Sequence, residues 1–276
     1  MDPFFFVPGS KLDKISAIQA LGCRNIIIDL EDAVKFSEQK LIVDKLIANP
    51  KLNTFFLRVP LINQESDQID ASIVNLLIDN GYKKFMLPKL KSLKDFEVFL
   101  SLTFIEKKSL ILLIETPRLF MEAKELLQKY SDFFLGISMG SHDFMALTHG
   151  VHTLENLEFP RQTILYLARM AGIMAIDIAS MELKNQDLFT QEVLDGFNKG
   201  YDAKLLIHPW QLALFNRIEF YSEKEHLWAR RIAGELKKVK SAGEFSPMVI
   251  DGQVYERPHL EKANRIIRYF ETRGNN

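Results

Sequence analysis

Eight short apolar runs recur along the chain, and each is followed by a longer stretch whose apolar residues have helical spacing. The runs do not alternate between polar and apolar residues, which is typical of parallel strands buried on both faces. Alternating strands and helices imply βαβ units. Eight units over about 210 residues favour the α/β class and a (β/α)8 TIM barrel over an open sheet. The expected strands cover residues 4–7, 25–29, 55–59, 84–88, 110–115, 133–137, 174–177 and 204–208.

The chain of 276 residues has room for two domains or for one large barrel with an addition. We expect the barrel to cover residues 1–220 and a C-terminal extension to cover residues 221–276. The extension is predicted to hold a long charged helix over 223–240, a hairpin within 243–258 and a last helix over 259–273. It follows the eight repeated units, so we interpret it as a lid rather than a second domain.

Composition excludes several classes of protein. The 35 Lys and Arg residues balance 36 Asp and Glu residues, so the chain lacks the basic excess of a nucleic-acid-binding protein. Its 47% of apolar residues is too high for a disordered chain. No apolar stretch approaches the roughly 18 residues that span a membrane, and the start lacks the basic region of a signal peptide. The single cysteine, Cys23, fits a reducing cytoplasm and is expected to be a buried apolar residue.

Polar residues follow most of the expected strands at their carboxyl ends. In a parallel barrel these ends lie on one face, where active sites form. A single Asp after a strand is most often a helix cap, but several crowded carboxylates repel each other unless a cation joins them. Oxygen ligands favour a hard ion such as Mg²⁺, and an arginine there offers a planar fork to a substrate carboxylate. The strand-end set is Ser10, Asp29, Glu31, Asp32, Arg58, Lys89, Glu115, residues 140–143, Asp177 and His208.

Several motifs in this set occur in an order that resembles one known family. They begin with Phe-Phe-Val-Pro-Gly-Ser at 5–10 and Asp-Leu-Glu-Asp-Ala-Val at 29–34. Further motifs are Leu-Pro-Lys at 87–89, Ile-Glu-Thr at 114–116, Met-Gly-Ser-His-Asp-Phe at 139–144 and Ile-His-Pro at 207–209. Together they resemble the citrate lyase β-subunit family of the HpcH/HpaI aldolase superfamily, which includes malyl-CoA and citramalyl-CoA lyases. The likeness spans nearly the whole chain.

The resemblance implies reversible cleavage of a carbon–carbon bond in a β-hydroxy acyl thioester, by way of an enolate. It implies that Glu115 and Asp143 bind Mg²⁺ and that Arg58 binds substrate oxygens. Glu31 and Asp32 would hold metal-bound waters or orient the site. CoA or an acyl-carrier thioester would form part of the substrate. The remaining substrate-binding or cofactor-binding candidates are Ser10, Gly140, Ser141, His142, His208 and Pro209.

The resemblance also gives the C-terminal extension a role. Family members commonly form trimers in which one subunit's tail covers its neighbour's site and supplies an acid/base aspartate. The corresponding pattern here, Asp-Gly-Gln-Val-Tyr-Glu-Arg-Pro at 251–258, places Glu256 at that position. Glu256 is therefore a catalytic candidate, and the alternative is a simple ion pair with Arg257 or a neighbouring basic residue. A homo-oligomer, trimer or hexamer, is expected, with no nucleic-acid or membrane partner.

The chain departs from the family pattern at positions near the expected site. Ser141-His142 replaces the usual Ala-Glu, so His142 is either a proton carrier or a loop histidine held by hydrogen bonds. Trp210 follows the His-Pro pair, where it would stack on a CoA arm or block it. Pro60 and Pro117 follow the arginine and glutamate motifs. Lys89 is expected to form an ion pair rather than a Schiff base.

Three hypotheses follow for function. The first is a Mg²⁺-dependent carbon–carbon lyase acting on a small dicarboxylic or hydroxy acid, free or as a thioester. The second is an aldolase of hydroxy-keto acids that uses no CoA. The third is a non-catalytic or assembly subunit of a multi-enzyme complex.

Overall fold

The computed structural model describes residues 1–63, 65–239 and 247–274, and within them the chain forms two compact units. The first unit covers Met1–Ile218 and the second covers Glu219–Asn276. None of the helices in these described ranges is long and apolar enough to cross a membrane.

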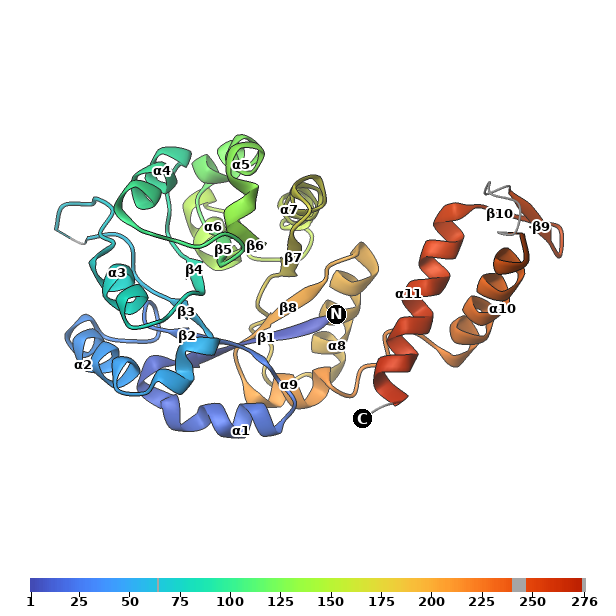
Figure 1. Cartoon of the computed structure of the whole chain (residues 1–276), viewed down its shortest axis with the longest axis horizontal. Coiled ribbons are helices and arrows are strands. Elements are labelled where there is room, and N and C mark those ends of the chain that lie inside the picture. Colours follow the sequence, from blue (N-terminus) through green and yellow to red (C-terminus); the bar gives the residue numbers. More distant parts are fainter. Residues whose placement is uncertain (64, 240–246, 275–276) are drawn as a thin grey trace. The chain divides into compact units, whose positions relative to one another are not determined.

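The first unit is a closed barrel of eight parallel strands in chain order, with helices around it (Figure 1). This confirms the predicted fold class. The strands are β1 (Asp2–Pro8), β2 (Asn25–Asp29), β3 (Phe56–Arg58), β4 (Phe85–Leu87), β5 (Leu110–Ile114), β6 (Phe134–Met139), β7 (Met174–Asp177) and β8 (Ala203–Leu206). The helices are α1 (Ile15–Ala20), α2 (Phe36–Ile47), α3 (Ser72–Asp79), α4 (Leu93–Leu102), α5 (Pro117–Tyr130), α6 (Ser141–Thr148), α7 (Glu158–Ala171), α8 (Gln186–Lys199) and α9 (Pro209–Phe215), with short 3₁₀ turns η1 (Gly9–Lys14), η2 (Pro50–Thr54) and η3 (Ser131–Phe133).

Apolar side chains from the strands fill the barrel interior. The buried cluster there includes Phe4, Ile27, Phe56, Ile111 and Leu205. Along a strand every second side chain points inward, so these positions set which strand-end residues face the cavity above them. The single cysteine, Cys23, is fully buried as expected, and burial raises the pKa of its thiol to about 11.

The second unit is a helical hairpin with a small sheet. It contains α10 (Glu223–Val239), β9 (Met248–Ile250), β10 (Gln253–Tyr255) and α11 (Arg257–Gly274), in which β9 and β10 pair antiparallel. Its own core is built from Ala229, Ile232, Tyr255, Ala263 and Ile266. The expected two helices and hairpin are therefore present. Residues 243–246 of the expected hairpin range, and residue 240 of the expected helix, lie outside the described part of the chain.

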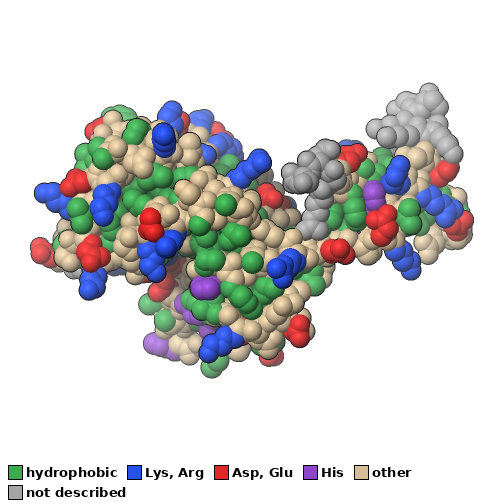
Figure 2. All heavy atoms as spheres, turned by 90° about the horizontal axis from the view of Figure 1, so that it is seen from below, with side chains coloured by type: hydrophobic (Ala, Val, Ile, Leu, Met, Phe, Trp, Pro, Cys, Tyr) green, Lys and Arg blue, Asp and Glu red, His purple; other side chains and the backbone are tan. Residues whose placement is uncertain are grey.

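The outer surface of the barrel unit carries mixed charges. On the face shown in Figure 2, basic and acidic side chains are interspersed among hydrophobic ones, without a continuous field of one sign. This pattern agrees with the formal net charge of −1 for the whole chain.

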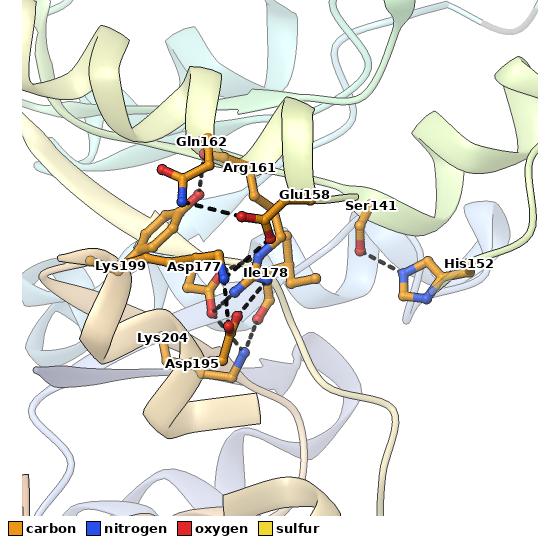
Figure 3. Close-up of polar contacts among 11 residues, drawn as sticks. Ser141, His152, Glu158, Arg161, Gln162, Asp177, Ile178, Asp195, Lys199 and Lys204 are labelled. Atoms are coloured by element: carbon orange, nitrogen blue, oxygen red, sulfur yellow. Dashed lines mark hydrogen bonds and ion pairs between the residues drawn. The ribbon is translucent and has the colours of Figure 1, made fainter. Parts of the chain in front are cut away.

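One sequence expectation about the strand ends is wrong. Asp177 was expected to face the barrel mouth, but its side chain points outward because Ile176 occupies the inward position of β7. Asp177 instead pairs with Arg161 of α7 and with Lys204 of β8 (Figure 3). The side chains of all three residues are at most 1% exposed. A β-carbon at Gly196 of α8 would lie 2.4 Å from the Asp177 carboxylate, so the helix packs directly on this ion cluster.

Replacing Asp177 by Asn is expected to lower the free energy of unfolding by about 3–5 kcal/mol, because it leaves Arg161 and Lys204 buried without their shared anion. Urea unfolding followed by circular dichroism measures this change. The control is Glu106→Gln, which breaks an exposed pair with Lys83 and should cost less than about 1 kcal/mol. Equal effects of the two substitutions would show that the buried cluster adds no net stability.

Candidate active site

A cavity of about 340 Å³ lies over the carboxyl ends of the barrel strands. Apolar side chains such as Phe6, Leu113 and Leu205 form its floor. The predicted site residues that line it are Asp32, Arg58, Glu115, Gly140, Ser141, His142 and Asp143. Residues from β3, β5, β6 and α6 thus meet in one place, as the strand-end argument predicts.

Arg58 is held by Asp29, the last residue of the neighbouring strand β2. Its Nε and Nη2 donate to the two Asp29 carboxylate oxygens at 2.8 and 2.7 Å. The two residues are register partners on adjacent strands and both point into the barrel mouth. The fork that was expected to meet a substrate carboxylate is therefore already occupied. The third nitrogen, Nη1, lies 3.2 Å from Asp32 and 3.6 Å from Glu31, at the cavity side of the pair.

Lys89 joins the same cluster through its ammonium group, which contacts Glu31 and lies 2.7 Å from Asp32. Burial opposes the charge, but the hydrogen bonds to Asp32 and Glu31 raise the pKa of Lys89 above its usual value. The expected ion pair is present, and an ammonium that keeps its proton is a poor Schiff-base nucleophile. Lys89 has a φ of +53°, a left-handed conformation that is rare for a side chain this long.

The two acidic residues of the cluster, Glu31 and Asp32, differ in pKa. Burial raises the pKa of Glu31 to about 7, although Lys89 and Arg58 oppose this. Asp32 is also partly buried, yet Lys89 and Arg58 hold its pKa below the usual range. Two neighbouring carboxyl groups with separated pKa values are suited to hold and pass a proton near neutral pH.

Glu115, directly after β5, is the most buried acid of the cavity at 2% exposed. Burial and the negative charges of Asp143 and Glu31 raise its pKa to about 8. One oxygen accepts the backbone N–H of Lys89. A β-carbon at Gly140 would lie 2.4 Å from Cγ of Glu115, so a larger residue at that position would force the Glu115 side chain to shift. Among the described residues, no basic side chain lies within ion-pair distance of Glu115.

The donor set of the cavity fits a divalent cation. Among the described residues, the carboxyl groups of Asp29, Glu31, Asp32, Glu115 and Asp143 face the two cations of Arg58 and Lys89. No group of three His, Cys, Asp or Glu side chains in the described ranges is arranged to hold a metal by itself. Glu115 and Asp143 therefore match the pattern of Mg²⁺, which takes one or two carboxylates and completes its shell with water and substrate.

Four predicted site residues of the barrel unit lie outside the lining of this cavity, namely Glu31, which pairs with Lys89 behind it, and Ser10, His208 and Pro209. Ser10 is exposed on η1, at the end of β1. His208 caps α9, where its Nδ1 accepts the N–H of Trp210 at 3.1 Å, and Pro209 is the first residue of that helix. Trp210 is half-buried, with its ring 5.8 Å from that of Phe189. The indole is thus engaged by α8 and does not line the cavity.

Glu256 belongs to the second unit and is exposed at the start of α11. Its N–H donates to Nδ1 of His259 at 3.0 Å. Among the described residues, Arg257 pairs with Glu261 rather than with Glu256. A pair with Arg257, one of the two forms of the alternative drawn from the sequence, is therefore not found in the described ranges.

Sequence reasoning missed two features of the site. Asp29 acts as the anchor of Arg58, which the strand register alone would have suggested. His152 lies in the loop between α6 and α7, and its Nε2 is 2.9 Å from Oγ of Ser141. Its ring also stacks on His142 at 3.8 Å between ring centroids. No motif marks His152, because loop residues eleven positions apart have no fixed spatial relation.

Comparison with known proteins agrees with this geometry. The family model for HpcH/HpaI aldolase/citrate lyase matches residues 3–209. The citrate lyase subunit beta of Leuconostoc mesenteroides subsp. cremoris is 26% identical over 277 residues, which cover 95% of this chain and 91% of that protein. The mitochondrial citramalyl-CoA lyase of Homo sapiens is 23% identical, covering 95% of this chain and 83% of that protein.

Among solved structures, the CitE protein of Mycobacterium tuberculosis, in complex with magnesium, acetoacetate and coenzyme A, superimposes with a TM-score of 0.77. The two chains are 24% identical, and the match covers 97% of each. The likeness confirms the barrel fold. The family match extends over well over half of the chain, and it confirms the resemblance drawn from the motifs: the chain belongs to the HpcH/HpaI aldolase/citrate lyase family.

Proposed function

We propose that this protein is a Mg²⁺-dependent carbon–carbon lyase that reversibly cleaves a β-hydroxy acyl thioester through an enolate. The observation that carries the proposal is the buried Glu115, which has no ion-pair partner among the described residues and lies near the half-buried Asp143, beside the Arg58–Lys89 cluster. The names of the related citrate lyase subunit and citramalyl-CoA lyase support a lyase of this kind. The magnesium and coenzyme A bound to the CitE structure support the metal and the thioester carrier.

Glu115 and Asp143 are the residues that would hold Mg²⁺. When bound, the ion supplies positive charge for the substrate oxygens and for the developing enolate. Nη1 of Arg58, which lies 3.2 Å from Asp32 and 3.6 Å from Glu31, binds a substrate carboxylate or acyl oxygen at the cavity, while Asp29 fixes the guanidinium plane. In the cleavage direction the hydroxyl proton passes to a base, the bond to the α carbon breaks, and the enolate carbon takes up a proton. Glu31 and Asp32 orient this chemistry and hold its protons.

The second unit is proposed to act as a lid that packs on the barrel or covers the site of a neighbouring subunit. Glu256 is exposed, unpaired with Arg257 and set at the junction of β10 and α11, a position open to a partner. It is proposed to serve as the acid/base carboxylate, in place of the aspartate of the family. A homo-oligomer, trimer or hexamer, follows from this role. The lone buried Cys23 supports action in the cytoplasm.

The test is turnover by the purified full chain with Mg²⁺ on a panel of malyl-, citramalyl- and citryl-thioesters. Formation of the matching oxo acid, followed by coupled reduction with NADH, is the expected result. Cleavage of free 4-hydroxy-2-oxo acids with no response to acyl-CoA would replace this proposal by the CoA-independent aldolase. Absence of cleavage on both panels would leave the assembly-subunit hypothesis in its place.

A further inference from the structure

Gln211 of α9 is a polar residue buried completely near the carboxyl end of β8, at 0% exposed. Its Nε2 donates to the backbone carbonyls of Ser180 and Glu182, at 2.8 and 3.0 Å. Its Oε1 accepts the backbone N–H groups of Ile207 and His208, at 2.9 and 3.3 Å. Two donors and two acceptors are the full capacity of a glutamine amide, and only this orientation of the amide serves all four partners.

These four hydrogen bonds join two segments that are separate in the sequence. The first is the loop 178–185 between β7 and α8, and the second is the short connection 207–208 between β8 and α9. Both segments line the cavity, the first through Ala179 and Met181 and the second through Ile207. We call these three side chains the apolar wall. Gln211 lies behind the wall and is not part of the cavity lining.

The apolar wall and the charged cluster belong to opposite sides of the barrel. In a closed barrel of eight strands in chain order, β7 and β8 lie across from β3, which carries Arg58, and β4, which precedes Lys89. An uncharged wall offers no partner to a carboxylate. It therefore suits the carbon skeleton of a substrate whose charged end lies at Arg58, and it contributes to binding rather than to charge stabilisation.

The loop that carries most of the apolar wall needs attachment to the barrel. Its first residue, Ile178, is held by Lys204, whose Nζ donates to the carbonyl of Ile178 at 2.7 Å (Figure 3). Further along, the side chains of Ser180 and Glu182 accept amides of the loop itself, which shapes the loop without tying it to another element. Gln211 then attaches the middle of the loop to α9.

From these contacts we infer that Gln211 is a positioning residue that holds the apolar wall in place and thereby sets the affinity for the substrate. Gln211 does not touch the substrate, and it acts through Ala179, Met181 and Ile207. The inference rests on the proposed function for the substrate with which affinity is measured. The connection between the two segments does not depend on that substrate.

The test compares Gln211→Glu with Gln211→Met in the full chain. The first keeps the acceptor for Ile207 and His208 but loses the donors to the loop, and the second removes all four bonds at similar size. Both are expected to raise KM for the hydroxyacyl thioester about 10-fold and to keep kcat within about 2-fold, because lost wall contacts weaken ground state and transition state alike. Met181→Ala, at a residue 55% exposed, should raise KM likewise without endangering the fold.

Hydrogen exchange, read by mass spectrometry, gives a second measurement that needs no substrate. The amides of residues 179–184 should exchange faster in both Gln211 variants than in the wild type. The matched control is Tyr82→Phe. Tyr82 is 1% exposed, and its hydroxyl donates to the carbonyl of Leu46 at 2.8 Å, away from the cavity lining. The control should melt at a lower temperature but keep the wild-type KM and the wild-type exchange of residues 179–184.

Three results would overturn the inference. One is a wild-type KM in the Gln211 variants and in Met181→Ala, and another is unchanged exchange of residues 179–184. The third is a lower kcat at unchanged KM, the sign of less folded enzyme, which would make Gln211 a structural residue only. Failure of the proposed function looks different: the wild type cleaves no thioester, while exchange in the loop still rises in the variants. The KM comparison is then made on the free 4-hydroxy-2-oxo acid.

Discussion

Replacing Glu115 by Gln is expected to lower kcat/KM for carbon–carbon cleavage by about 10²–10³-fold and to weaken Mg²⁺ binding. Gln keeps the size of the side chain in its tight contact with Gly140 but removes the negative charge. Asp143→Asn should act in the same direction, because both carboxylates are assigned to the same ion. Activity is measured by oxo-acid formation, and Mg²⁺ affinity by calorimetry.

The matched control for this pair is Glu125→Gln on α5, where an exposed carboxylate pairs with Lys129. It should leave both the rate and the Mg²⁺ affinity unchanged. Unaltered Mg²⁺ affinity in both Glu115→Gln and Asp143→Asn would show that these two residues do not bind the metal.

The same substitution has a consequence for pH dependence in the absence of Mg²⁺. The pKa of Glu115 rises from 4.5 to about 8 in the folded state, because burial penalises the carboxylate. The folded chain therefore binds the proton more tightly than the unfolded chain, and stability from this group falls as pH rises from 4.5 through about 8. The Glu115→Gln variant should not show this loss of stability as the pH rises. Urea unfolding in EDTA at several pH values compares the two proteins.

Replacing Arg58 by Lys is expected to lower kcat/KM by at least about 100-fold, although the positive charge is kept. A lysine cannot reproduce the two parallel hydrogen bonds to Asp29, so the remaining donor would no longer be held over the cavity. The loss should appear in kcat as well as in KM, since the donor stabilises charge that develops during cleavage. Steady-state kinetics on the hydroxyacyl thioester gives both values.

The barrel offers a close control for this change. Arg169 makes a similar two-point pair with Asp202, at 2.7 and 2.9 Å, on a partly exposed surface away from the cavity lining. Arg169→Lys tests the loss of such a pair without touching the site, and its activity should equal that of the wild type. If Arg58→Lys were as active as Arg169→Lys, Arg58 would have no part in holding the substrate.

Much of the barrel can be predicted from the sequence because buried parallel strands leave a simple signal. Runs such as 25–29 and 174–177 have apolar residues in succession, without alternation, up to a final aspartate, and their bounds in the structure equal those expected. The direction of a strand-end side chain is harder to predict. Asp177 follows its strand just as Asp29 does, yet the first points outward to Arg161 and the second inward to Arg58. Successive side chains of a strand point to opposite faces. A difference of one position therefore decides whether an aspartate at a strand end joins a structural ion cluster or anchors an active-site arginine.

The residues of the candidate site also differ in how well the sequence predicts them. Glu115, Asp143 and Arg58 could be predicted because strand ends converge whatever the loops do. The contact between Ser141 and His152 could not, since it depends on the path of the loop after α6. The role proposed for Glu256 comes from the family resemblance rather than from the strand pattern, because the residue lies in a separate unit outside the barrel.

The narrow space around Gly140 offers a way to sort proteins of this kind by sequence. Any residue with a side chain there would press against Glu115. The backbone at this position has little freedom to move away, because the N–H of Gly140 donates to the carbonyl of Ile114 at the end of β5. A larger residue at the equivalent position of another chain with this barrel therefore predicts that the glutamate is displaced or replaced.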